Sequence, residues 1–194
     1  MKLPRRQGFS MALGALMLLA SSRVSAQGRS FKDQDLARKN FREQQLDGAD
    51  FSGATLGNAD FSRASLRGAN FQDADLRSTM FSGADLTGAD LRNSIGPFIA
   101  PGETNFSNAN LEGLDLKDAR LFAPNFRGAN LRNTTGWGSV TRGSFRGADL
   151  RGANLRGAEA LHPDESMFVG AIYDDNTSWP DWAEKAKARA KRAQ

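Results

Sequence analysis

Apolar residues return at every fifth position through most of the chain. In LDGADFSGATLGNADFSRASLRGANFQDADLRSTMFSGADL, residues 46–86, Leu or Phe fills this position nine times in succession. An α-helix advances about 100° per residue and a strand alternates faces every two residues, so neither element keeps such a spacing on one side. A five-residue unit keeps its apolar residue pointing inward only if the chain turns a corner within each unit. The pattern therefore predicts a solenoid.

We name the Leu or Phe position the centre of each unit. In the strongest units Ala lies two residues before the centre, Asp or Asn lies one before it, and Gly often lies two after it, as in Ala49-Asp50-Phe51-Ser52-Gly53. The chain holds 24 centres in four series, which are Phe31 to Leu91, Phe106 to Leu131, Phe145 to Leu155, and Phe168 with Tyr173. The small residue two before the centre indicates a narrow interior, because a larger side chain would not fit there beside the centre.

These units resemble the A(D/N)LXX repeats of the pentapeptide-repeat family, and GAIYDDNTSWP, residues 170–180, is similar to the segment that ends many members. The resemblance implies an all-β fold, a right-handed quadrilateral β-helix with about 20 residues in a coil and coils stacked about 4.8 Å apart. The alternation of Phe and Leu centres from Phe31 to Leu86 independently predicts four faces, with Phe columns on two opposite ones. The residues before the centre would then form outward columns.

One such column reads Asp50, Asn70, Asp90, Asn110 and Asn130, and another begins Asp35, Thr55, Asp75. No two Asp residues are neighbours in these columns, which indicates avoidance of like charges between coils. A metal-binding row of carboxylates is the alternative interpretation, but the carboxylates lie a full layer apart. We therefore interpret them as solvated positions.

The first 26 residues differ from the repeats and have the order of a signal peptide. Basic residues precede the apolar run FSMALGALMLLA, and VSA supplies small residues at the cleavage position. The run falls short of the roughly 20 residues that span a bilayer. We expect cleavage near Ala26 and a location outside the cytoplasm, in the periplasm or the thylakoid lumen, where the resembling family is well represented. The pair Arg5 and Arg6 leaves Sec and twin-arginine export both open.

We expect the solenoid over residues 27–173 and a cap with a basic tail over 174–194. Positions 29, 34, 39 and 44 carry Arg, Gln, Lys and Gln in place of Ala, which predicts an irregular first coil that acts as the N-terminal cap. After Ser178, Pro180 and Asp181, an Ala-rich run with Lys and Arg toward its end predicts a short C-terminal helix. Trp179 and Trp182 are expected to lie over the last coil. A solvated tail and a tail that docks on anionic lipid or an acidic partner both stay open.

Composition removes most enzymatic chemistry. The chain has no Cys, which excludes disulfides and thiol catalysis, and its one His, His162, lies in a Pro-containing loop. It contains no HExxH, no GxSxG and no Gly-rich phosphate loop. The net charge of +4 falls to zero without the first 26 residues, which hold four bases and no acid. We therefore expect no enzyme, no cofactor and no metal, and the high pI does not indicate nucleic-acid binding.

Three interruptions separate the series of centres, at residues 95–104, 133–143 and 159–165. The first two follow Leu91 and Leu131, two coils apart, and the third reaches an adjoining face, so the loops are predicted to form a column. Aromatic anchors and Arg are typical of binding hot spots. The candidate partner-binding patch consists of Phe98, Ile99, Arg120, Phe122, Trp137 and Arg142. The alternative is that these aromatic residues pack the loops against one another.

The sequence therefore predicts a non-enzymatic extracytoplasmic structural or binding module, a scaffold with a protein partner. The resemblance also offers an alternative, because some family members mimic DNA and bind topoisomerases. That group is cytoplasmic, acidic and dimeric, whereas this chain has the leader described above and a basic collar. Residues 119–158 contain seven Arg and one acid, Asp149. Arg146, Arg151 and Arg156 fall on successive faces, so they ring a coil and do not line a nucleic-acid groove.

Overall fold

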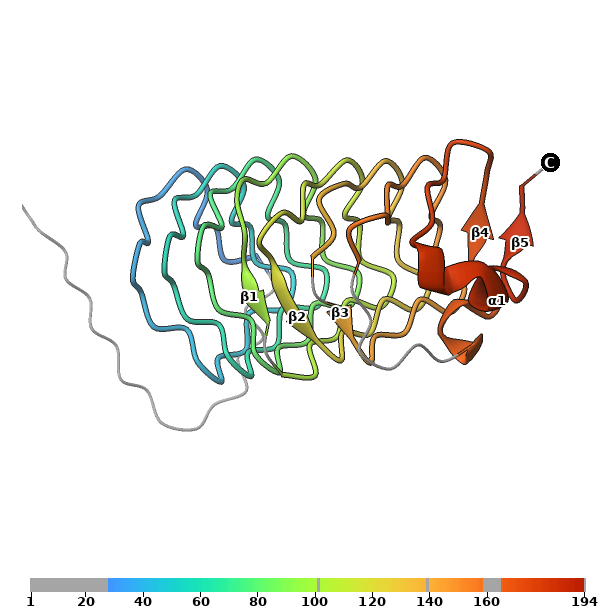
Figure 1. Ribbon diagram of the computed structural model, residues 1–194. Helices are drawn as coiled ribbons and strands as arrows, with labels where there is room; N and C mark the ends of the chain where they lie inside the picture. The colour runs from blue at the N-terminus through green and yellow to red at the C-terminus, as the bar shows by residue number, and fades with distance from the viewer. Residues whose placement is uncertain (1–27, 101, 139, 159–164, 194) are drawn as a thin grey trace, which may run out of the picture.

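The computed structural model describes residues 28–100, 102–138, 140–158 and 165–193. The chain winds into a rod of stacked coils, with the first coil at one end and the C-terminal segment at the other (Figure 1). Parallel bridges join residues 20 apart, such as Ser30 with Asp50 and Asp50 with Asn70. Because the Phe31 N–H donates to the Asp50 C=O (2.7 Å) and the Asp50 N–H to the Arg29 C=O (2.9 Å), each coil hydrogen-bonds the next along the rod.

Four centres complete each coil, as the sequence predicts. We number the faces by the centres of the first coil: face 1 begins at Phe31, face 2 at Leu36, face 3 at Phe41 and face 4 at Leu46. The residue two after the centre makes the corner and has a positive φ in unit after unit, as at Gly53 (65°). Gly is common there because it adopts this conformation without strain.

Stacked phenylalanines fill the N-terminal half of the rod. Phe31 stacks on Phe51 along face 1 (4.7 Å between ring centroids) and meets Phe41 of face 3 edge to face (5.8 Å), and the same contacts recur in the following coils. In the C-terminal half a single stack continues on face 4, through Phe106, Phe126, Phe145 and Phe168. The prediction that the centres point inward is confirmed by their burial.

Amide groups bridge the outward polar columns. Asp50 Oδ1 accepts the Ser52 N–H (3.0 Å) and also Asn70 Nδ2–H (3.1 Å) from the next coil. Asn130 Nδ2–H donates to Asn110 Oδ1 in the same way (3.0 Å). An Asn can accept within its own unit and donate to a neighbour, whereas two stacked carboxylates would repel. This explains why Asp is followed by Asn in the column.

The interruptions form a short parallel sheet on face 3. Strands β1 (Ile99–Ala100), β2 (Arg120–Phe122) and β3 (Val140–Thr141) lie side by side in that order (Figure 1). Ile99 is opposite Arg120, and Leu121 is opposite Val140. The first two interruptions therefore stack with one coil between them, as predicted. Residues 159–164 of the third lie outside the described residues.

The first coil is regular, so its predicted irregularity is wrong, although its predicted place at the open N-terminal end is kept. Ser30, Asp35, Asn40 and Gln45 bridge the second coil like any later unit. The larger side chains in place of Ala are exposed because no coil covers them. Gln34 Nε2–H donates to the Ser30 C=O (3.3 Å), and Gln44 Nε2–H to the Asn40 C=O (3.3 Å). These amides cap the open end.

The C-terminal segment closes the other end. It contains two 3-10 turns, η1 (Glu165–Phe168) and η2 (Asp181–Ala183), the strand β4 (Ile172–Tyr173), the single helical turn α1 (Glu184–Lys187) and the strand β5 (Lys191–Arg192). A 3-10 turn begins at Asp181 and α1 is a single turn, so the predicted C-terminal helix is not confirmed. Trp179 and Trp182 lie against Phe168 as predicted.

The predicted helical tail is wrong beyond Lys187. β5 instead pairs in parallel with β4, because the Lys191 and Ala193 N–H groups donate to the Ala171 and Tyr173 C=O groups (2.6 and 2.7 Å). Residues 1–26, interpreted above as a signal peptide, lie outside the described residues. Over the described ranges no helix has the length and apolar character to cross a membrane.

Candidate functional site

The structure divides the six predicted patch residues into core and surface. Phe98 and Trp137 are 1% and 2% exposed, so the assignment of these two side chains to a binding patch is wrong. Ile99 is half-buried, and Arg120, Phe122 and Arg142 are exposed, Phe122 at 43%. The patch is therefore smaller than expected.

Two glycines explain why Phe98 and Trp137 turn inward. The Leu76 N–H donates to the Ile95 C=O and the Leu116 N–H to the Thr135 C=O, each at 2.9 Å, which places Gly96 and Gly136 at centre positions of face 2. Both glycines have a positive φ, and a Cβ at either would collide with the preceding coil at Arg77 or Lys117. No centre side chain therefore enters the interior from these two positions, and the aromatic residue that follows fills the place.

Trp137 is held in this interior by specific contacts. Its Nε1–H donates to Thr134 Oγ1 (3.1 Å), and its ring lies edge-on to Phe126 and Phe145 (centroids 5.8 and 5.6 Å away). The sequence carried a signal for this arrangement, namely Gly96 and Gly136 at positions 20 residues after Leu76 and Leu116.

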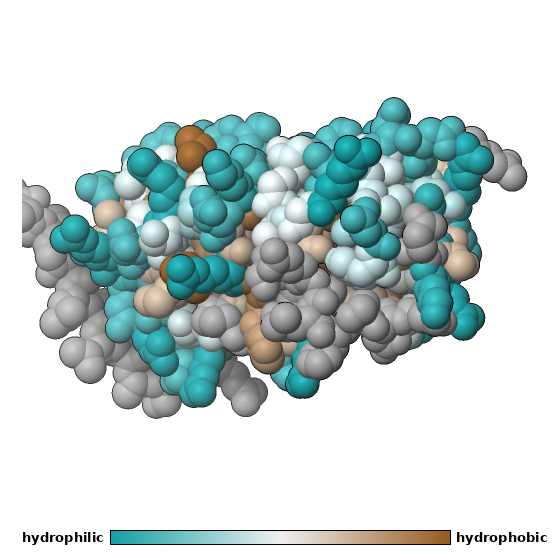
Figure 2. Space-filling model, viewed as in Figure 1, coloured by the Kyte–Doolittle hydropathy of each residue, from teal (hydrophilic) through white to brown (hydrophobic). Residues whose placement is uncertain are grey.

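Two exposed apolar residues that the sequence prediction did not include adjoin the remaining patch. Met80 is 37% exposed and bridges Ile99, while Ile95 is 58% exposed and lies just before Gly96. Both stand one before a centre position, where Asp or Asn is usual, which is the signal that could have found them. Figure 2 shows apolar surface broken by hydrophilic side chains on this side of the rod. We define the loop face as Met80, Ile95, Ile99, Arg120, Phe122 and Arg142.

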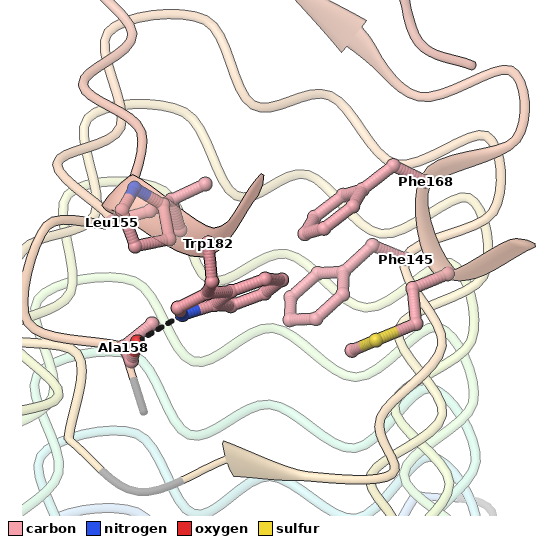
Figure 3. A pocket seen from close by; sticks show the side chains of 7 residues that line it. Phe145, Leu155, Ala158, Phe168 and Trp182 are labelled. Carbon is pink, nitrogen blue, oxygen red and sulfur yellow. Dashed lines mark hydrogen bonds between the residues drawn. The ribbon is translucent and has the colours of Figure 1, made fainter. Parts of the chain in front are cut away.

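A small gap remains under the C-terminal cap. Trp182 lies across it beside Phe145 and Phe168, with its Nε1–H donated to the Ala158 C=O (2.8 Å; Figure 3). Leu155, Met167 and Pro180 complete an apolar lining around about 10 Å³. That volume is about the least that holds one water molecule, and an apolar lining offers it no hydrogen bonds. The gap is therefore a packing feature of the cap.

Arg and Asp pairs along the outside give the rod its electrostatics. Arg77 pairs with Asp75 (2.5 Å) and Arg92 with Asp90 (2.7 Å), each within one unit. The Arg77 hydrogen bond to Asp75 lowers the pKa of that carboxyl against the effect of burial. Burial raises the pKa of Asp90, but the hydrogen bonds from Arg92 and Gln72 outweigh it, so the pKa of Asp90 is also lowered.

Metal ligation has no candidate in the part of the chain that the structure describes, since no three His, Cys, Asp or Glu residues gather there to hold an ion. His162 lies outside that part. Outward Asp side chains accept hydrogen bonds from neighbouring backbone and amide groups, as Asp50 and Asp85 do. Their chemistry is that of a hydrogen-bonded lattice.

The five-residue unit, the four faces and the inter-coil bridges define a quadrilateral β-solenoid. The sequence model for pentapeptide repeats matches this chain in 8 copies, over residues 30–63, 56–93, 102–135 and 141–160. The chain belongs to the pentapeptide-repeat family.

Solved structures of pentapeptide-repeat proteins are similar to this chain at low identity. QnrB1, a plasmid-mediated fluoroquinolone resistance protein, is 17% identical over 86% of this chain and 90% of its own, with a TM-score of 0.38. A protein from the Arabidopsis thaliana thylakoid lumen is 27% identical over 81% of this chain and 90% of its own, with a TM-score of 0.27. HetL, involved in heterocyst differentiation regulation in the cyanobacterium Nostoc sp. strain PCC 7120, is 21% identical over 84% of this chain and 80% of its own, with a TM-score of 0.27. A comparison with curated protein sequences gives no significant match.

Proposed function

We propose that this protein is a non-enzymatic extracytoplasmic scaffold that binds a protein partner through the loop face. The observation that carries the proposal is Phe122, which is 43% exposed next to the buried centre Leu121. Regular units place small polar or charged side chains outward, so a large exposed ring among Met80 and Ile99 is a departure from the lattice.

The cations of the loop face support a partner with carboxylates. Arg120 and Arg142 are exposed, and neither makes an ion pair with another residue that the structure describes. An Arg beside an aromatic anchor offers a planar fork for a carboxylate and an apolar contact together. We therefore expect the partner to present an apolar side chain flanked by Asp or Glu.

Capture of the partner by matched variants tests the binding site. Phe122→Ser should reduce capture at least tenfold while the melting temperature changes little, because the ring is at the surface. Ile172→Ser is the matched control, since this side chain is exposed to a similar extent on the opposite face. Capture that survives Phe122→Ser unchanged, or that falls equally with the control, would remove the loop face as the site.

Export is tested separately by N-terminal sequencing of the protein purified from its native host. A first residue at or near Gln27 outside the cytoplasm supports the extracytoplasmic role. An intact Met1 in the cytoplasm, together with topoisomerase in the captured material, would replace the proposed function by topoisomerase binding.

A further inference from the structure

The side of the rod opposite the loop face carries a second surface near the C-terminal end. β4 and β5 lie on face 1, two corners away from β1 to β3, and their arrows run in the opposite direction (Figure 1). Asn130 bridges Asp149, Asp149 bridges Ile172, and Ile172 pairs with Lys191. This column continues the row of residues that precede the centres.

Basic residues follow the corner beside this column. The Gly128 N–H donates to the Arg146 C=O, Gly147 to Val169 and Gly170 to Arg189, at 2.9 to 3.1 Å. These bonds place Arg127, Arg146, Val169 and Arg189 in successive coils at the same corner, and all four are exposed. We define the basic face as Arg127, Arg132, Arg146, Arg151, Val169, Ile172, Arg189 and Lys191.

Among the described residues, ion pairs are more frequent in the N-terminal coils than on the basic face. In the N-terminal coils Arg42, Arg63, Arg67, Arg77 and Arg92 each pair with Asp or Glu. In the basic face Arg151 pairs with Asp149. Arg127, Arg132 and Arg146, by contrast, have no ion pair with any residue in the described ranges, and Arg132 Nε is buried there without a hydrogen-bond partner. Arg127 and Arg146 are exposed, so their charge is available to an external anion.

The acids near this face are already engaged. Asp149 pairs with Arg151, and Asp175 pairs with Arg192. Asp174 Oδ1 accepts the Gly152 N–H (2.9 Å) and Thr177 Oγ1–H (3.0 Å). Glu112 lies one coil before Arg132 and accepts Asn130 Nδ2–H (3.2 Å). Four acids of the described residues near this face therefore stand against seven bases, counting Arg192 with the basic face.

Apolar side chains lie among these cations. Val169 and Ile172 are 37% and 36% exposed, and they occupy the coil between Arg146 and Lys191. Neither is an aromatic anchor of the kind found at the loop face. Rows of cations at the coil spacing of about 4.8 Å, with short aliphatic side chains between them, match a flat layer of negative headgroups above an apolar boundary.

We propose that the basic face binds an anionic membrane surface, with the Arg rows on lipid phosphates and with Val169 and Ile172 at the headgroup boundary. An acidic protein is the competing occupant. A protein hot spot is built around large anchors in a desolvated centre, and the loop face on the other side supplies that kind of residue. The proposal does not depend on the loop face binding a partner.

Vesicle binding of the full chain tests the proposal. The protein is mixed with phosphatidylcholine vesicles, with and without phosphatidylglycerol, at low and high salt, and the bound fraction is measured by sedimentation. Arg127→Glu with Arg146→Glu should lower binding to anionic vesicles at least tenfold. Val169→Ser with Ile172→Ser should lower it several-fold and leave its salt dependence unchanged, because the charges remain.

Arg38→Glu with Lys117→Glu is the matched control. It changes the net charge equally, replaces exposed residues away from the basic face, and should change binding less than twofold. The N-terminal segment is the same in every variant, so differences in vesicle binding between variants arise from the substituted surface residues. Thermal melts check that each variant is folded.

Three results would overturn the proposal. The first is equal loss in the two charge-reversal variants, which would show that net charge alone drives binding. The second is no preference for anionic vesicles. The third is an effect of Arg127→Glu with Arg146→Glu on binding to polyglutamate but not to vesicles, which would assign the face to an acidic protein.

Discussion

The Phe98 ring lies edge-on to Phe81, with centroids 5.8 Å apart and planes at 84°. Met80 bridges Ile99, so Ala100 stands at the centre position beside Phe81, and Phe98 stands two before it, beside Thr79. The large and small residues of the unit have therefore exchanged places. The interior accepts either order because it is filled by total volume, with Gly96 leaving additional room nearby.

Phe98→Ala is expected to lower the free energy of unfolding by about 3–5 kcal/mol, because it leaves a cavity in a closed interior. Adding Ala100→Phe to that variant should restore part of the loss by returning the unit to the usual order. Denaturant melts measure both, with the exposed Lys117→Ala as a control that changes stability by less than about 0.5 kcal/mol. If the double variant were less stable than Phe98→Ala, the interpretation that the large and small residues have exchanged places would be wrong.

Trp137→Ala should destabilise the fold by about 3–5 kcal/mol, and Trp137→Phe by less, because the smaller ring keeps part of the packing and loses the hydrogen bond to Thr134. Phe122→Ser should cost less than about 1 kcal/mol. Thermal and urea unfolding of the three variants make the comparison. A Trp137→Ala protein as stable as the wild type would return Trp137 to the surface and to the binding patch.

Asn105→Asp tests the outward polar column. Asn105 Nδ2–H donates to Asp85 Oδ1 (3.1 Å), and the substitution replaces this bond by two adjacent carboxylates. We expect a loss of about 1–3 kcal/mol at pH 7 that shrinks at pH 3, where the carboxyls take up protons. Asn108→Asp is the control, since Asp33 and Asp73 occupy equivalent exposed corners. Equal losses at both pH values would rule out charge repulsion as the cause.

The rod should lose stability in acid. The folded pKa is lowered at Asp50, Asp60, Asp75, Asp85, Asp90, Asp149 and Asp174, from an ordinary value of 3.8. A carboxyl with a lowered folded pKa stabilises the protein above its unfolded pKa, and this contribution disappears as the pH falls toward the folded value. Urea midpoints should therefore be similar at pH 7 and 5 and lower at pH 3. Asp75→Asn with Asp90→Asn should flatten this dependence, and a midpoint that rises toward pH 3 would contradict the assignment.

The fold followed from the sequence because one spacing is repeated throughout the chain. Each Leu or Phe centre faces the same narrow interior, so the five-residue period predicts the solenoid. The alternation of Phe and Leu predicts the four faces and the Phe columns, and the 40-residue separation of the first two loops predicts that they stack. The structure of the end segments was harder to predict, since the local helix propensity competes there with strand pairing to an open edge. The Ala-rich run after Lys187 favours a helix, yet the unpaired backbone of β4 draws Lys191 and Arg192 into a strand.

The candidate site was predicted in part for a similar reason. The outward prediction is correct for four residues, Ile99, Arg120, Phe122 and Arg142. Phe98 and Trp137 were predicted to point outward because they are aromatic residues in loops, and their residue type was the only criterion. Their burial depends on the volume left by glycines in a neighbouring column, which only the register between coils shows. The basic face was recognised as a collar of charge, but its continuation onto Lys191 depends on the unexpected strand β5.

The change of aromatic stacking at Phe98 also limits how the rod can be lengthened. Before it, Phe lies on faces 1 and 3, so a duplicated coil from residues 48–67 meets neighbours with the same arrangement on both sides. After it, the stack runs along face 4, and the same inserted coil would bring Phe against Leu on faces 1 and 3 and Leu against Phe on face 4. The molecule is therefore extendable by whole 20-residue modules in its N-terminal half, whereas the junction at β1 joins two halves whose modules are not interchangeable.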